Sequence, residues 1–436
     1  MTPLDPWIAG TIGAPADAPL APARLAAWQL ARLNETLALA REQSPFYRQR
    51  LAAAPDGPDR LDSLDGLGFL PFTTAEDLRD HGLNMLCCSQ GEIARVVSLE
   101  TSGTSGPAKR LFFTADDLER TVDFFHHGLT TFMEPGRRLF VCLPGTTPAS
   151  VGDLLRQALP RLGGEALVHG LVRDPGETLA ALADSRAEAL VGLPAQVLAL
   201  ARHPASRLGR GLESVLLCSD YVPRAVREAV AQAWGCRVLA HWGMTETGLG
   251  GGVECLARSG YHLRAADLLI EIVDPDTGRT LPAGASGEIV LTTLTRRGLP
   301  LIRYRTGDRG QLADGACACG SIVPRLARVS GRIAGEFPLP GGGRLALADL
   351  DELLFPLPWL LDFEAGVRRD GPGLILDLTL HATPDTIPGP ARGEAAAALS
   401  ALPPGASAGA LRILPGARPT GAAKRGFTTT AREERP

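Results

Sequence analysis

Short hydrophobic runs alternate with amphipathic stretches between residues 92 and 241. The short runs predict buried strands, and the amphipathic stretches predict helices that pack on them. Thr114 is a good helix N-cap, because acidic residues follow it in the first turn. This succession favours a three-layer α/β fold with a mainly parallel sheet, whose strand ends should bind a ligand. The expected strands are 93–99, 138–143, 165–171, 188–193, 214–218 and 237–241, and the expected helices are 151–162, 176–185, 195–202 and 223–234.

The pattern changes at both ends of this region. The first ninety residues predict helices separated by turns rich in Pro, Asp and Gly. Between about residues 253 and 312 helical signals fade and β-branched residues alternate, so we place a β-rich subdomain at 252–330. From residue 331 the sequence predicts helices at 346–354 and 394–399 and strands at 361–367, 374–381 and 410–414. We therefore expect a large N-terminal domain, 1–331, and a small α+β C-terminal domain, 332–436.

Composition fits an ordinary globular protein. The chain has 436 residues, a formal net charge of −4 and a pI near 6.1, which gives no electrostatic reason to expect a nucleic-acid or membrane partner. No run approaches the roughly 20 apolar residues of a membrane span, and the N-terminus does not resemble a signal peptide, so a cytoplasmic location is expected. The sequence allows a homodimer but does not specify the oligomeric state.

Only two of the 44 basic residues are lysines, Lys109 and Lys424. A compact ammonium does chemistry that a planar guanidinium cannot, so both are candidates for phosphate or carboxylate contacts. The alternative is that both are simply solvated. Lys109 closes a loop rich in Ser, Thr and Gly, whose hydroxyl and backbone N–H groups are suited to phosphate oxygens. This loop is not a P-loop, which needs a helix starting at Gly-Lys-Ser/Thr.

Four motifs in order carry a resemblance to a known family. They are Ser102-Gly-Thr-Ser-Gly106, Trp242-Gly-Met-Thr-Glu246, Tyr304-Arg-Thr-Gly-Asp308 and Gly331-Arg332. In this order they resemble the core motifs of the adenylate-forming superfamily of acyl-CoA synthetases. Flanking segments, such as Glu271-Ile-Val-Asp-Pro-Asp-Thr-Gly278, are similar to the phenylacetate–CoA ligase branch. The resemblance covers about residues 25–335 well and the remainder weakly.

The resemblance implies roles for individual residues in binding ATP, Mg²⁺ and coenzyme A. It implies that the C-terminal domain is a lid, that Thr245 touches the α-phosphate, that Glu246 helps to hold Mg²⁺ and that Asp308 grips the ribose. Trp242, which stands where the family usually has tyrosine, would stack on the adenine. The remaining nucleotide contacts that it implies are Ser102, Gly103, Thr104, Ser105, Gly106, Lys109, Ser219, Asp220, Tyr221, Gly243 and Arg332.

The sequence departs from the family at two places. The family has a catalytic lysine directly after a glycine in the C-terminal domain, whereas Gly421 is followed by two alanines before Lys424. Two interpretations are open. Lys424 performs the catalytic role from a position two residues further along the chain, or it corresponds to a neighbouring basic residue of the family and the catalytic lysine has been lost. At the hinge, Gly331-Arg332 is followed by one acidic residue, Glu336, instead of a pair. Adenylation and transfer to coenzyme A must therefore be judged separately.

Cys255, His262, Cys317 and Cys319 flank the β-rich subdomain. Three thiolates and an imidazole suit tetrahedral Zn²⁺, and Cys-x-Cys-Gly resembles the hairpins of structural zinc sites. The alternative is that these cysteines are buried thiols, which is the role we expect for the other five.

These inferences together predict an ATP- and Mg²⁺-dependent, AMP-forming ligase that joins a small carboxylic acid, aromatic acids included, to coenzyme A. Two alternatives stay open at this point. The enzyme could pass its acyl-adenylate to an acceptor other than coenzyme A, or the chain could be a nucleotide-binding regulatory protein that has lost turnover.

Overall fold

The computed structural model describes residues 2–15, 19–53, 59–99, 108–418 and 425–429. By its internal contacts the chain forms two compact units. The first comprises Met1–Gly136, Gly145–Gly164 and Leu239–Val329, and the second comprises Arg137–Pro144, Glu165–Val238 and Ser330–Pro436. The predicted boundary near residue 331 stays a prediction, because the second unit groups the C-terminal residues with part of the preceding region.

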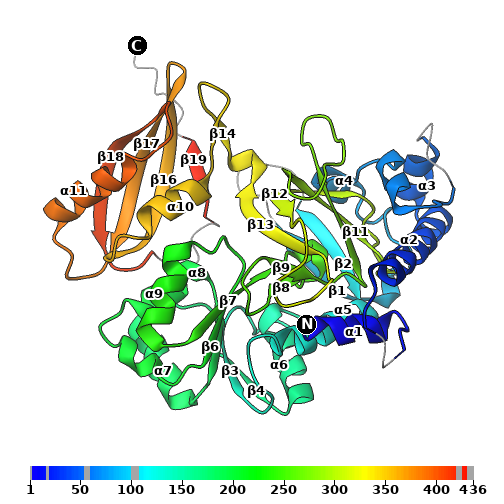
Figure 1. Ribbon diagram of the computed structural model, residues 1–436, viewed down its shortest axis with the longest axis horizontal. Helices are drawn as coiled ribbons and strands as arrows, with labels where there is room; N and C mark the ends of the chain where they lie inside the picture. Colours follow the sequence, from blue (N-terminus) through cyan, green and yellow to red (C-terminus); the bar gives the residue numbers. More distant parts are fainter. Residues whose placement is uncertain (1, 16–18, 54–58, 100–107, 419–424, 430–436) are drawn as a thin grey trace. The chain divides into compact units, whose positions relative to one another are not determined.

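The first unit combines N-terminal helices with a mostly antiparallel β-region (Figure 1). Its strands follow the spatial order β10-β11-β12-β13-β9-β8-β7, and the pairs whose register is described are antiparallel. β1 and β2 form a separate hairpin. The helices are α1 (Leu4–Thr11), α2 (Pro22–Gln43), α3 (Pro45–Ala52), α4 (Ala75–His81), α5 (Ala115–Leu129) and α6 (Val151–Ala158); the strands are β1 (Ile93–Leu99), β2 (Lys109–Thr114), β7 (Arg237–Trp242), β8 (Gly252–Glu254), β9 (Tyr261–Leu263), β10 (Leu268–Val273), β11 (Ser286–Thr293), β12 (Tyr304–Leu312) and β13 (Arg325–Arg332).

The second unit contains the parallel α/β layer. Its strands run in the order β6-β5-β3-β4, all parallel, with α7, α8 and α9 in the connections (green in Figure 1). Their bounds are β3 (Arg138–Cys142), β4 (Glu165–Val168), β5 (Ala189–Gly192), β6 (Ser214–Leu217), α7 (Pro175–Ser185), α8 (Pro194–Ala201) and α9 (Arg224–Trp234). The predicted α/β class and the parallel sheet are confirmed, but the strand predicted at 93–99 lies outside that sheet and pairs antiparallel with β2.

A four-stranded sheet, β18-β17-β16-β19, follows in the same unit, and α11 packs against β18 and α10. Its elements are β14 (Phe337–Pro338), β15 (Arg344–Leu345), α10 (Leu347–Leu354), β16 (Leu360–Asp370), β17 (Gly373–Ala382), α11 (Pro388–Leu399), β18 (Ala406–Pro415) and β19 (Phe427–Thr429). The predicted helices and strands are present. β19, which pairs parallel to β16, was not predicted, because three residues carry too short a pattern.

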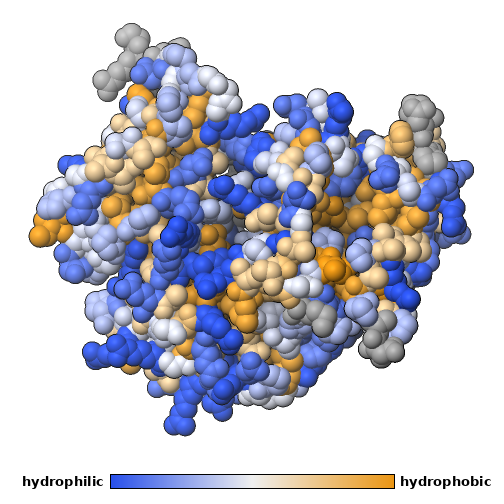
Figure 2. All heavy atoms as spheres, in the orientation of Figure 1, coloured by the Kyte–Doolittle hydropathy of each residue, from blue (hydrophilic) through white to orange (hydrophobic). Residues whose placement is uncertain are grey.

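Each unit has its own hydrophobic core. The core of the first unit is formed by residues between Leu33 and Leu326, and the core of the second joins the parallel sheet to the C-terminal sheet in one cluster. Hydrophilic and hydrophobic residues are interspersed on the face that Figure 2 shows. None of the helices in the described part of the chain is both long and apolar enough to cross a membrane.

Candidate active site

Three residues from the predicted motifs meet in the interior of the first unit. Lys109 begins β2, Glu246 lies in the short 3-10 turn Thr245–Thr247, and Tyr304 begins β12. The Lys109 Nζ donates to Glu246 Oε1 and, over 3.3 Å, to the Tyr304 hydroxyl, which donates to Glu246 Oε1 over 3.1 Å. None of the three is more than 7% exposed. Lys109, which is expected to touch phosphate, is therefore paired with the buried carboxylate of Glu246, which is expected to hold Mg²⁺.

Glycines shape the turn that carries Glu246. A Cβ on Gly243 would lie 2.5 Å from the carbonyl oxygen of Leu249, so a larger residue there would displace the backbone. Gly248, which follows the turn, has a φ of +74°, a left-handed conformation that glycine adopts without strain. Thr245 is partly exposed beside the buried Glu246. The turn thus buries Glu246 while the preceding residue, Thr245, stays partly exposed.

Trp242 and Asp308 lie in the same unit. The Trp242 side chain is 7% exposed, and a Cβ on Gly251 would lie 2.5 Å from its ring, so the indole packs directly on the glycine backbone. Asp308 lies partly buried in β12, where its backbone N–H donates to the Thr306 hydroxyl over 3.1 Å. Their roles toward adenine and ribose stay predictions.

The other predicted nucleotide contacts are distributed differently. Ser219, Asp220 and Tyr221 follow the carboxyl end of β6 in the second unit, and Ser219 has a φ of +69°. Arg332 ends β13 and is exposed. The loop Ser102 to Gly106 and Lys424 lie outside the described residues, so their roles also stay predictions.

Sequence reasoning missed two residues near the predicted chemistry. Tyr304 was given no role, although it opens the motif that ends at Asp308, and that position is the signal that could have found it. Arg425 was also missed, because nothing in the sequence distinguishes it from the other arginines. Its contacts are described below.

The four predicted zinc ligands come together within the first unit. One ligand atom from each of Cys255, His262, Cys317 and Cys319 lies within 4.8 Å of all the others. The Cys255 and Cys317 sulfurs are 3.7 Å apart, and the Cys319 sulfur is 3.6 Å from His262 Nε2. Tetrahedral zinc with bonds of about 2.3 Å to sulfur and about 2.0 Å to nitrogen would separate such atoms by about 3.8 and 3.5 Å. The geometry fits the predicted ligand set.

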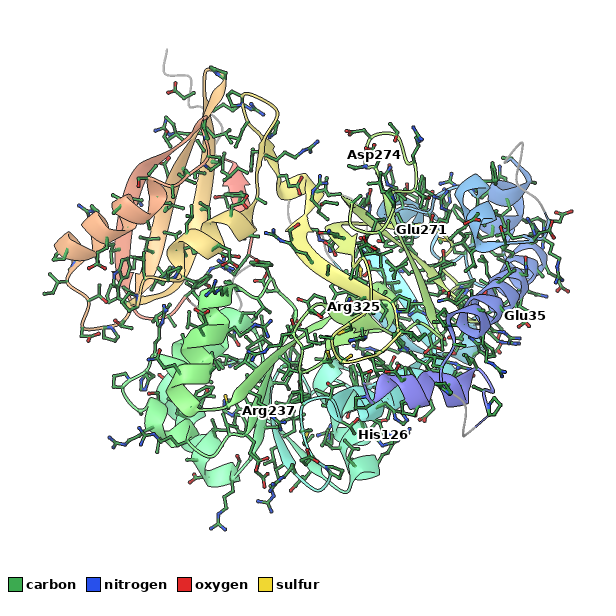
Figure 3. The ribbon with its side chains drawn as sticks, viewed as in Figure 1. Glu35, His126, Arg237, Glu271, Asp274 and Arg325 are labelled. Carbon is green, nitrogen blue, oxygen red and sulfur yellow. The ribbon has the colours of Figure 1, made fainter. Side chains whose placement is uncertain are left out.

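Neighbouring polar groups hold the loops that carry these ligands. Ser259 Oγ lies 3.3 Å from the Cys317 sulfur, and Arg325, labelled in Figure 3, donates to Ser259 Oγ over 2.9 Å and to the Gly315 carbonyl over 3.1 Å. Burial lowers the pKa of His262 to about 4, which keeps the imidazole neutral. Although burial opposes it, hydrogen bonds from Ser259, Cys319 and Cys255 lower the pKa of Cys317 to about 7, whereas burial raises the pKa of its partner Cys255 to about 12. A neutral imidazole and a readily ionised thiol are the forms that bind zinc.

Comparison with known proteins places this geometry in a class. A family model described as AMP-binding enzyme matches residues 97–294, which include Lys109 and Glu246. The solved structure of 2-hydroxyisobutyryl-CoA ligase with 2-HIB-AMP has the same fold, with a TM-score of 0.79 at 21% identity over 96% of this chain and 94% of that one. Over the matched residues the chain is similar to AMP-binding enzymes, and its fold is that of this acid–CoA ligase.

Two relatives narrow the class. The chain is 31% identical over 363 residues to the phenylacetate-coenzyme A ligase of Thermus thermophilus. The aligned residues cover 80% of this chain and 79% of that protein. It is 29% identical over 325 residues to the enzyme of the same name from Escherichia coli, covering 71% of each. The chain belongs to the phenylacetate–CoA ligase family of AMP-forming acid–CoA ligases.

Proposed function

We propose that this member of the family adenylates a small carboxylic acid, aromatic acids included, and transfers the acyl group to coenzyme A in an ATP- and Mg²⁺-dependent reaction. The observation that carries the proposal is the buried group formed by Lys109, Glu246 and Tyr304, which joins the residue that closes the Ser/Thr/Gly loop to two of the family's motifs. The names of the relatives support the acceptor, since each is a coenzyme A ligase. They give less support to the two alternatives that the sequence left open, namely an acceptor other than coenzyme A and a regulatory protein that has lost turnover.

The chemistry requires positioned charge and no protein nucleophile. A carboxylate oxygen of the acid attacks the α-phosphorus of ATP in line, and the bond to pyrophosphate breaks as the acyl-phosphate bond forms. The coenzyme A thiolate then attacks the acyl carbon, and AMP leaves with the bonding electron pair. Because the attacked α-phosphate and the leaving pyrophosphate both carry negative charge, cations and hydrogen-bond donors supply most of the rate enhancement. We assign Thr245 to the α-phosphate. We assign two further contacts with the negatively charged oxygens to the lysines, one to Lys109 beside the Ser/Thr/Gly loop and one to Lys424 in the C-terminal lid domain.

Glu246 is the residue that would hold Mg²⁺. A carboxylate oxygen is the hard ligand that this ion prefers, and the ion would supply charge neutralisation at the phosphates. Glu246 is buried and paired with Lys109, so it is already held in one orientation.

A pyrophosphate–ATP exchange assay with a panel of carboxylic acids tests the first half-reaction. We expect exchange that depends on one class of small acid, and thioester formation when coenzyme A is added to the same mixture. No exchange with any acid would refute adenylation. Exchange without a thioester would refute coenzyme A as the acceptor and leave adenylation standing.

We also propose that Cys255, His262, Cys317 and Cys319 hold a structural zinc ion that ties the β8–β9 hairpin to the loop before β13. The supporting observation is the agreement between their separations and a tetrahedral S₃N site. Metal analysis of protein purified without added metal should find about one equivalent of zinc. Less than about a tenth of an equivalent would dismiss the site.

A cytoplasmic location is part of the same proposal, supported by the eight cysteines, none of which forms a disulfide bond in the described part of the chain. Cell fractionation tests it. Sedimentation at several concentrations tests whether the chain forms a homodimer.

A further inference from the structure

A single buried arginine meets three carboxylates in the second unit. The Arg425 side chain is 9% exposed, and its Nη2 lies 2.6 Å from Asp351 Oδ1 while its Nε lies 2.9 Å from Asp362 Oδ1. Its Nη1 lies 3.8 Å from Asp220 Oδ2. The guanidinium carbon is also 4.7 and 5.2 Å from the ring centroids of Phe363 and Phe355. One residue thus joins the loop after β6, helix α10 and strand β16.

The charges in this cluster do not balance. Asp351 is 1% exposed and Asp362 is 7% exposed, so both carboxylates depend on protein partners for compensation. One guanidinium compensates three acids by contacting each of them. Without that cation the acids would repel one another, and the most exposed of them, Asp220, would be the easiest to displace.

Asp220 belongs to the segment expected to border the adenine. The next residue is also connected to α10, since the Tyr221 hydroxyl donates to Glu352 Oε1 over 2.8 Å. The same Glu352 oxygen accepts from the backbone N–H of Arg224 over 3.2 Å. The segment therefore has two connections to the helix, one direct and one through Arg425, and both lie within one compact unit.

We propose that Arg425 is a positioning residue for the nucleotide, which holds Asp220 and Tyr221 in the conformation that receives the adenine of ATP. The proposal rests on the function proposed above. The proposal gives Arg425 a role different from the phosphate contact proposed above for the neighbouring Lys424. The effect of Arg425 should be on the KM for ATP more than on kcat.

The test compares variants in the pyrophosphate–ATP exchange assay and in urea unfolding. We expect Arg425→Ala to raise the KM for ATP about tenfold or more with a smaller change in kcat, and Arg425→Lys to restore part of the loss. Asp362→Asn is the matched control, because it removes a partner of Arg425 that does not touch the nucleotide segment. Because it also removes one of the excess negative charges, it should leave the urea midpoint close to that of the wild type and the KM for ATP within about twofold.

A double-mutant cycle distinguishes positioning from two separate contacts. If Arg425 acts through Asp220, the effects of Arg425→Ala and Asp220→Asn on the KM will be clearly less than additive. Additive effects would overturn the proposal, as would a KM for Arg425→Ala within twofold of the wild type. If the wild type shows no exchange with any acid, the proposed function fails instead. ATP affinity by calorimetry then tests the role of Arg425, with the same outcomes expected for Kd.

Discussion

Replacing Arg303 by methionine should destabilise the first unit more than any exposed arginine substitution. The Arg303 side chain is 2% exposed and meets Glu271, labelled in Figure 3, through two contacts of 3.1 Å. Its Nη1 donates to the carbonyls of Gly68 and Leu70 over 2.9 and 2.7 Å, and its guanidinium lies 4.1 Å from the Phe72 ring centroid. It therefore fixes the start of β12 against the segment before α4.

The magnitude follows from what the substitution leaves behind. Methionine fills most of the volume, but the Glu271 carboxylate stays buried, and among the described residues the Thr280 hydroxyl, 3.2 Å away, is the side-chain donor that remains to it. Removing one partner of a buried ion pair costs about 3 to 5 kcal/mol, and two carbonyl acceptors are orphaned as well. Since the net stability of a protein is about 5 to 15 kcal/mol, this is a large fraction.

Urea unfolding followed by tryptophan fluorescence measures the effect. We expect the midpoint of Arg303→Met to fall by about 1 M or more, taking an m-value of about 3 kcal/mol/M. Arg32→Met, at a pair whose side chains are 30% and 50% exposed, is the matched control and should change little. The double variant Arg303→Met/Glu271→Met should recover part of the loss, because it removes the unpaired charge. A single variant whose midpoint equals that of the control would refute the reasoning.

Three further predictions concern the chemistry, the metal and the pH dependence. Lys424→Ala should lower pyrophosphate exchange by well over tenfold with ATP affinity nearly intact, and unchanged exchange would exclude the proposed role. Cys319→Ser should lose most of the bound zinc while Cys88→Ser, outside the cluster, keeps it, and equal metal content in the two would contradict the site. Burial raises the pKa of Asp351 from 3.8 to about 7 against the attraction of Arg425, so between these values the folded state holds a proton that the unfolded state has released. The stability contribution of Asp351 is therefore present at low pH and lost toward pH 7, and Asp351→Asn should flatten the difference between urea midpoints at pH 5 and 7.5; an unchanged difference would argue against it.

The parallel region was predictable because its signals are local. Each strand between residues 138 and 218 is a short apolar run, and each connection carries a helical period, so the pattern alone fixes the class. The capping box at Thr114, where the hydroxyl accepts from the Asp117 N–H, is readable for the same reason. The four metal ligands were found because cysteine and histidine are rare enough in this chain for their spacing to carry information.

The polar contacts between distant segments could not be predicted in the same way. Arg425 meets residues 63, 74 and 205 positions away, and no period or spacing links them in the sequence. The contact of Tyr304 with Glu246 likewise depends on how β12 lies in the sheet. Such pairs are set by tertiary packing, whereas the residue types themselves are common at surfaces and in turns.

The retained lysine at position 109 illustrates how the two levels combine. Its ammonium contacts a carboxylate and a phenol hydroxyl in a space where it is only 7% exposed. An arginine there would bring five rigidly arranged donors, of which these two acceptors could satisfy only some, and the unsatisfied donors would be costly to bury. A chain that uses arginine at 42 other positions can therefore favour lysine here on packing grounds alone.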